Sequence, residues 1–125
     1  MRAEERDPLT ERIIACALRV HRTLGPGLLE SAYHGALTIE LEHQGFTVER
    51  ERVFPALYRG IKVGDYRPDL IVDGEVIIEI KSVAAYDPVF MAQMLTYLRI
   101  TGITVGLIIN FNRRALRDGI KRVVL

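Results

Sequence analysis

Two apolar runs joined across Asp73-Gly74 constrain the fold of this chain more than any other feature. They cover residues 66–72 and 76–83, and an Asp-Gly pair between such runs is a strong short-range signal for a β-hairpin. We therefore expect the two runs to form the central strands of a sheet.

Segments with helical spacing lie on both sides of this hairpin. Asp7-Pro8 and Asp87-Pro88 are typical helix starts, because a capping residue precedes a proline. The first helix should end at Gly25-Pro26-Gly27 and place Ile13, Ala17, Val20 and Leu24 at helical spacing; the second, over 29–44, should have Leu29, Tyr33, Ala36, Leu37 and Leu41 on one face; the third should cover 89–100.

Strand-like segments fill the rest of the pattern. Residues 46–66 have a period of two that is broken at Arg59-Gly60, and residues 104–110 resemble a buried strand. The tail, 111–125, carries five basic residues before a final Val-Val-Leu. This order predicts an α/β fold with a mixed central β-sheet flanked by helices.

Size and composition narrow the class of protein. With 125 residues, the chain is expected to form a single domain over 1–125. The net charge of +1 means that any contact with nucleic acid needs a local basic face. Cys16 is the only cysteine, which excludes an internal disulfide and favours a reducing, cytoplasmic location.

Membrane and secretory signals are absent from the sequence. No apolar run approaches the length of about 18 residues that a membrane span needs, and the N-terminal MRAEERD is acidic where a signal peptide has its apolar segment. We expect no contact with a membrane.

The second central strand contains two charges in an apolar run. Glu79 and Lys81 are two residues apart, so they lie on the same face of the strand. Burying either charge without a partner costs several kcal/mol, so the strand needs a mutual ion pair, another charge or a metal ion. Asp69, on the adjoining strand after Pro68, is the nearest candidate partner.

The turn decides whether Asp69 and Glu79 share a face. A two-residue Asp73-Gly74 loop pairs position 69 with position 78 and places the carboxylates on opposite faces. A three-residue loop over 72–74, with Gly74 at positive φ, pairs position 69 with position 77 and places Asp69, Glu79 and Lys81 together. A shared site therefore requires this longer loop or a bulge near Pro68.

Two converging carboxylates and a backbone carbonyl form a hard oxygen site that suits Mg²⁺ or Mn²⁺. A lysine beside such a site can orient or deprotonate a water molecule, which favours phosphodiester hydrolysis. The alternative from the residues alone is a structural ion pair between Glu79 and Lys81 in the core.

Three motifs in the expected order resemble those of a known family. Pro68-Asp69 followed by Glu79-Ile80-Lys81 resembles the PD-(D/E)xK motif of the restriction-endonuclease-like nucleases. Gly27-Leu28-Leu29-Glu30-Ser31-Ala32-Tyr33 is similar to the signature of the small GxxExxY proteins in that superfamily, and Gln93-Met94-Leu95-Thr96-Tyr97 to the QxxxY motif of its RecB-like branch.

This resemblance implies a restriction-endonuclease-like core and a Mg²⁺-dependent nuclease. It implies that Asp69 and Glu79 bind the metal with help from the Ile80 carbonyl, and that Lys81 acts on the attacking water. Glu30 would approach the metal directly or through water. Gln93 and Tyr97, which are four residues apart on one helical face, would orient Lys81 or a phosphate. The implied partner is nucleic acid, with DNA favoured.

Several of these residues have simpler explanations. Glu30 suits the first turn of a helix, Gln93 an ordinary polar helix position, and Tyr97 a core or boundary position. Cys16 is interpreted as a buried thiol, and the histidines have no zinc-site spacing. His34, four residues after Glu30, is within reach of the site but is interpreted as a surface histidine.

Two other classes of protein remain as alternatives to a nuclease. One is a catalytically silent nuclease-fold module that binds nucleic acid or a partner protein. The other is a structural oligomerising domain in which Glu79 and Lys81 form a core ion pair. A homodimer is also considered, because it would extend the short surface that a chain of this size offers to DNA.

Overall fold

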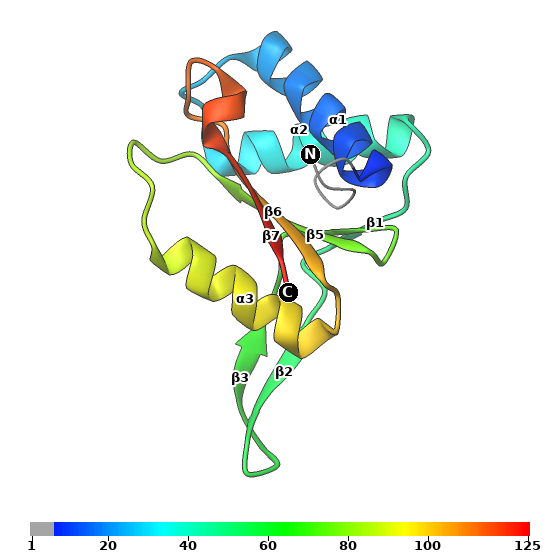
Figure 1. Cartoon of the computed structure of the whole chain (residues 1–125), viewed down its shortest axis with the longest axis vertical. Coiled ribbons are helices and arrows are strands. Elements are labelled where there is room, and N and C mark those ends of the chain that lie inside the picture. Colours follow the sequence, from blue (N-terminus) through cyan, green and yellow to red (C-terminus); the bar gives the residue numbers. More distant parts are fainter. Residues whose placement is uncertain (1–6) are drawn as a thin grey trace.

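The computed structural model describes residues 7–125, and residues 1–6, which belong to the segment used to argue against a signal peptide, lie outside the described part. The described residues form three α-helices, a short 3₁₀ turn and seven strands, whose arrangement can be followed in Figure 1. The helices are α1 (Pro8–Leu24), α2 (Glu30–His43) and α3 (Val89–Thr101), with the 3₁₀ turn η2 at Leu116–Gly119. The strands are β1 (Val48–Arg50), β2 (Phe54–Tyr58), β3 (Ile61–Tyr66), β4 (Leu70–Val72), β5 (Val76–Lys81), β6 (Val105–Asn110) and β7 (Ile120–Val124).

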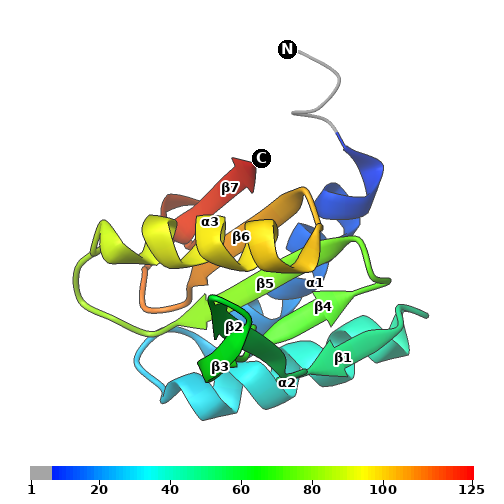
Figure 2. The same cartoon turned by 90° about the horizontal axis from the view of Figure 1, so that it is seen from below.

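Five strands form the main sheet in the order β1-β4-β5-β6-β7. β5 and β6 are parallel and the other neighbours are antiparallel, so the predicted mixed sheet is confirmed. α1 and α2 cover one face and α3 the other (Figure 2). Because β4 and β5 are covered on both faces, every residue from Val76 to Ile80 is buried, which explains the continuous apolar run in the sequence.

Alternate residues of β5 face different cores. Ile78 and Ile80 pack with α1 and α2, whereas Ile77 packs with Met94 and Leu98 of α3. Glu79 and Lys81 have the same parity as Ile77 and therefore lie on the α3 side of the sheet.

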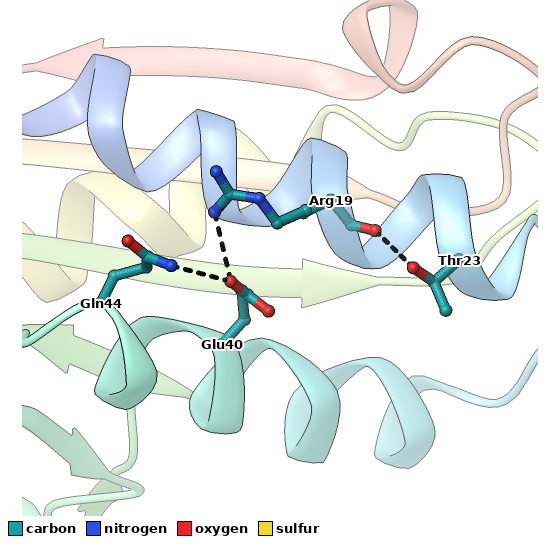
Figure 3. A network of polar contacts seen from close by, with 4 residues as sticks. All are labelled: Arg19, Thr23, Glu40 and Gln44. Atoms are coloured by element: carbon teal, nitrogen blue, oxygen red, sulfur yellow. Dashed lines mark hydrogen bonds and ion pairs between the residues drawn. The ribbon is translucent and has the colours of Figure 1, made fainter.

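A polar contact joins the two helices on the opposite side of the sheet. Arg19 of α1 pairs with Glu40 of α2 at 3.2 Å, and Gln44 donates to the same carboxylate at 3.4 Å (Figure 3). The pair is half-exposed, so it contributes about 1 kcal/mol or less. The apolar residues between the helices and the sheet, Ile13 and Leu37 among them, hold this layer together.

The turn between β4 and β5 differs from both predicted loops. β4 and β5 pair Leu70 with Ile78 and Val72 with Val76, so the loop is 73–75 and neither the two-residue turn nor a loop over 72–74. Asp73 and Gly74 both have positive φ, and the Glu75 N–H donates to the Val72 carbonyl at 2.9 Å. Glu75 is thus the extra residue that restores the shared face, and Gly74 has the predicted positive φ.

A second segment holds Asp73 in its unusual conformation. The Asp73 carboxylate accepts from the Thr47 N–H at 2.8 Å, and the Asp73 N–H donates to the Thr47 carbonyl at 2.8 Å. Asparagine and aspartate tolerate positive φ better than other residues with side chains. Thr47 precedes β1 in the chain, so a contact outside the hairpin selects this turn.

Several predicted boundaries were wrong for local reasons. The run 66–72 divides at Pro68 into the end of β3 and the start of β4. Leu29 precedes the first turn of α2 and Leu24 ends α1, so both are exposed rather than packed in a core. The tail forms η2 and the edge strand β7, which the basic pattern of 111–125 did not suggest.

The β2–β3 hairpin extends beyond the main sheet (Figure 1). Its turn at Arg59-Gly60 agrees with the predicted break, but several apolar residues in it are exposed, including Leu57 and Val63. Within residues 7–125, no helix is both long and apolar enough to cross a membrane.

Candidate metal centre

Asp69 and Glu79 meet across β4 and β5. Continuing the observed register by one residue places them directly opposite each other. The Asp69 N–H donates to Oε2 of Glu79 at 2.7 Å, and the Ile80 N–H donates to Oδ2 of Asp69 at 2.8 Å. Backbone donors therefore fix both carboxylates, and in the described part of the chain the second oxygen of each one makes no hydrogen bond.

Burial makes these carboxyls unusual acids. Glu79 is only 4% exposed, and burial, followed by the negative charge of Asp69, raises its pKa to about 8. Burial also raises the pKa of Asp69, although the Ile80 N–H and the nearby positive charges act in the opposite direction. Two close carboxylates in a poorly solvated site destabilise each other, and a bound cation would relieve that repulsion.

The Ile80 carbonyl faces the same pair. The Lys81 carbonyl accepts from the Phe111 N–H on the β6 side of β5. Since backbone groups alternate between neighbouring strands, the carbonyl of Ile80 points toward β4, as its N–H does toward Asp69. The backbone thus offers a third oxygen beside the carboxylates.

A cavity of about 270 Å³ opens beside Asp69. We call it the acidic cavity because three carboxylates line it. Glu30 lies in the first turn of α2 on its wall, so the structure brings Glu30, Asp69 and Ile80 to one space. The lining residues are Glu30, Ser31, His34, Arg50, Glu51, Asp69 and Ile80.

The loop before α2 positions Glu30. The Tyr33 hydroxyl donates to the Gly25 carbonyl and accepts from the Leu28 N–H at 3.1 Å. Ser82, just after β5, donates to the Leu28 carbonyl at 2.6 Å. Tyr33 is also fully buried against Phe111. These contacts explain the spacing of the Gly27, Glu30 and Tyr33 motif, since the tyrosine holds the turn that delivers the glutamate.

Lys81 does not form the ion pair that the structural alternative requires. In residues 7–125 it has no carboxylate within 4.0 Å, and its Nζ lies 4.5 Å from the ring centre of Phe90. Its positive charge still lowers the pKa of both Asp69 and Glu79. Lys81 therefore lies near the carboxylates, and its ammonium group contacts the ring of Phe90 in the first turn of α3.

Exposed Gln93 and buried Tyr97 contact each other one turn apart on α3. The Gln93 side-chain amide donates to the Tyr97 hydroxyl at 3.0 Å. Burial, then the charges of Glu79 and Asp69, raises the pKa of Tyr97 to about 12. The hydroxyl is therefore a neutral hydrogen-bonding group close to the carboxylates, and Phe90, rather than this pair, contacts Lys81.

His34 and Arg50 line the acidic cavity. The sequence indicated that His34 was within reach of the site, whereas Arg50 was not singled out. Arg50 lies 3.3 Å from Nδ1 of His34, and because arginine only donates, the other ring nitrogen, Nε2, carries the proton. That Nε2 is buried and has no partner in the described residues. The spacing of four residues from Glu30 was the available signal in the sequence. His34 is half-buried on the cavity wall rather than fully exposed on the surface.

The donor set suits a hard divalent cation in part. Two fixed carboxylates and a carbonyl are the oxygen ligands that Mg²⁺ and Mn²⁺ prefer. Nevertheless, no three histidine, cysteine, aspartate or glutamate side chains within residues 7–125 converge as a ready-made metal cluster. Glu30 lies on the cavity wall and does not complete such a set, which agrees with two direct protein carboxylates and further ligands from water.

Comparison with known proteins gives one match. No curated protein and no solved structure matches the chain. A family model described as the PD-(D/E)XK nuclease superfamily matches residues 7–123, which is nearly the whole length and includes Asp69, Glu79 and Lys81. The five-stranded mixed sheet between helices agrees with the restriction-endonuclease-like fold. The chain therefore belongs to the PD-(D/E)XK nuclease superfamily.

Proposed function

We propose that this protein is a Mg²⁺- or Mn²⁺-dependent nuclease that hydrolyses phosphodiester bonds in DNA. The observation that carries the proposal is the facing pair of Asp69 and Glu79, each fixed by a backbone N–H and each with one oxygen left for a ligand. These carboxylates and the Ile80 carbonyl would hold the ion, and Glu30 would contact it through water. When bound, the ion supplies positive charge against the charge that develops on the phosphate.

The remaining residues have distinct parts in this proposal. Lys81 lies beside the carboxylates, where its ammonium group orients the attacking water and favours loss of its proton. Gln93 and Tyr97 form one hydrogen-bonded unit that lines the same side of the sheet and offers neutral donors to a phosphate oxygen. His34 and Arg50 would add polar groups to the wall of the acidic cavity.

Within the superfamily, we infer that the chain is one of the small GxxExxY proteins and has the QxxxY motif of the RecB-like branch. The contacts of Tyr33 with the turn at residues 25–28 and of Gln93 with Tyr97 give each motif a physical reason. We also infer that residues 1–125 act as one unit.

The proposal is tested with linear, circular and single-stranded DNA, in Mg²⁺, Mn²⁺ or EDTA. Asp69→Ala and Glu79→Ala should each abolish metal-dependent cleavage and leave the fold intact. Glu42→Ala, at an exposed position of α2, is the matched control and should cleave like the wild type. Wild-type rates in both site variants would show that the assigned residues are wrong. Binding of DNA without cleavage in either metal would favour the silent-module alternative.

A further inference from the structure

A second cavity is lined by Lys81 and carries an excess of positive rather than negative groups. Its volume is about 100 Å³. Lys81, Arg113 and Lys121 line it together with the single carboxylate of Asp118, which leaves two positive charges in excess. We call it the cationic cavity. Lys81 lines the cationic cavity, and its neighbour Ile80 lines the acidic cavity.

Two aromatic rings hold the lysines at this cavity. The Nζ atom of Lys121 lies 4.6 Å from the ring centre of Tyr86, and that of Lys81 lies 4.5 Å from the ring centre of Phe90. The rings of Tyr86 and Phe90 contact each other edge to face. An ammonium group over a ring keeps its charge and its donors on the open side, so the ring pair holds two cations in place without neutralising them.

The backbone makes the opposite wall rigid. The Asn110 side chain accepts from the N–H groups of Val83 and Asn112 at 3.1 Å and donates to the Val83 carbonyl at 3.0 Å. A side chain on Gly119 would collide with the Asn110 carbonyl, so only glycine lets η2 pack this closely. Arg113 is held against Gly119, and its Nε atom is buried with no partner in residues 7–125.

The strand register fixes the distance between the two sites. Glu79 lies beside Ile108 of β6, and Ile108 beside Lys121 of β7. Lys121 is therefore two strands from Glu79 on the same face, at a separation of about 10 Å between backbones. Both sites can thus lie along one extended strand of nucleic acid.

We propose that the cationic cavity binds a phosphate group of the nucleic acid next to the one that is cleaved. The ligand class is a phosphate oxyanion, because a small cavity lined by three cationic groups and one carboxylate matches its charge and offers donors to its oxygens. The assignment to nucleic acid rests on the proposed nuclease function, whereas binding of phosphate at this position does not.

The first experiment titrates inorganic phosphate, in EDTA and at constant ionic strength, and follows backbone amide shifts by NMR. Shifts should centre on residues 110–121, and Lys121→Gln should weaken phosphate binding about tenfold. Lys121→Arg should retain binding. Lys62→Gln, which removes the same charge on β3, is the matched control and should bind like the wild type. Shifts elsewhere, or equal affinity in Lys62→Gln and Lys121→Gln, would overturn the site.

The second experiment distinguishes nucleic acid from free phosphate. Binding of a labelled single-stranded DNA oligonucleotide is measured by fluorescence anisotropy in EDTA at several salt concentrations. Loss of one phosphate contact in Lys121→Gln should reduce the slope of log affinity against log salt by about 0.7, with no change in Lys62→Gln. An unchanged slope in Lys121→Gln would overturn the assignment to nucleic acid.

These measurements need no turnover, so failure of the cleavage assay would leave a measured phosphate site in place. Conversely, a wild-type protein that cleaves DNA in metal but binds no phosphate beside Lys121 would overturn the cationic cavity and leave the nuclease proposal intact.

Discussion

Raising the pH from about 5 to about 8 should destabilise the metal-free protein, and Glu79→Gln should remove the part of that effect that is due to Glu79. Glu79 is 4% exposed, and burial beside Asp69 raises its pKa from 4.5 to about 8. In this pH range the folded protein holds a proton that the unfolded chain releases. The free energy of unfolding must therefore fall as the pH rises through the window between the two pKa values.

The magnitude follows from the number of protons released. One proton changes the free energy of unfolding by at most about 1.4 kcal/mol per pH unit. Burial also raises the pKa of Asp69, which acts in the same direction. A small domain is typically stable by about 5–15 kcal/mol. A decrease of about 1.4 kcal/mol per pH unit across this window would therefore remove a large fraction of the free energy of unfolding.

The assay is urea unfolding in EDTA at four pH values for the wild type, Glu79→Gln and Glu42→Gln. The difference between the wild type and Glu79→Gln reports the buried carboxyl, and Glu42→Gln shows what an exposed carboxyl contributes. Glutamine has nearly the same shape and keeps an oxygen for the Asp69 N–H. The free energy of unfolding of Glu42→Gln should differ from that of the wild type by nearly the same amount at every pH. For Glu79→Gln this difference should change steeply with pH.

Divalent cation should reverse the trend, because it favours the charged carboxylates. Saturating Mg²⁺ at 100 times its Kd should add about 2.7 kcal/mol, with a larger gain at pH 8 than at pH 5. Equal slopes for the wild type and Glu79→Gln in EDTA would refute the reasoning, since Glu79 would then titrate like an exposed acid. If Mg²⁺ stabilised the protein equally at pH 5 and pH 8, its binding would not be coupled to ionisation of these carboxyls.

Three further substitutions test separate parts of the structure. Lys81→Ala should bind metal like the wild type by calorimetry yet cleave poorly, and full turnover would remove the lysine from the mechanism. Gly74→Ala should cost about 1 kcal/mol in unfolding experiments because its φ is positive, and should weaken metal binding by disturbing the register; an unaltered Kd would contradict the second effect. Gly119→Ala should cost more than Gly74→Ala, since its side chain meets the Asn110 backbone rather than open space; the opposite order would contradict the close packing.

Local patterns in the chain were sufficient to predict most of the elements. The Asp-Pro pairs mark where α1 and α3 begin, because capping and a proline in the first turn are properties of neighbouring residues. The period of two in β5 determines that Glu79 and Lys81 share a face. The chemical types of Asp69 and Glu79 are likewise explicit in the sequence.

The turn between β4 and β5 could be predicted only in part. Face parity required an odd loop for a shared site, and Gly74 does have a positive φ. Which three residues form the loop depends on Thr47, which pairs with Asp73 from outside the hairpin. A change of one residue in register moves every side chain to the other face, so a distant contact decides whether the carboxylates meet.

By itself, the sequence determined the order of elements and the pair of acids, because periodicity, capping and turn chemistry act between residues that are close in the chain. Only the tertiary structure decided what surrounds that pair. His34 and Arg50 reach the acidic cavity from α2 and β1, Phe90 takes the ammonium group of Lys81, and Lys121 returns on the edge strand β7. These neighbours are far apart in sequence, and sheet order, packing and register bring them together.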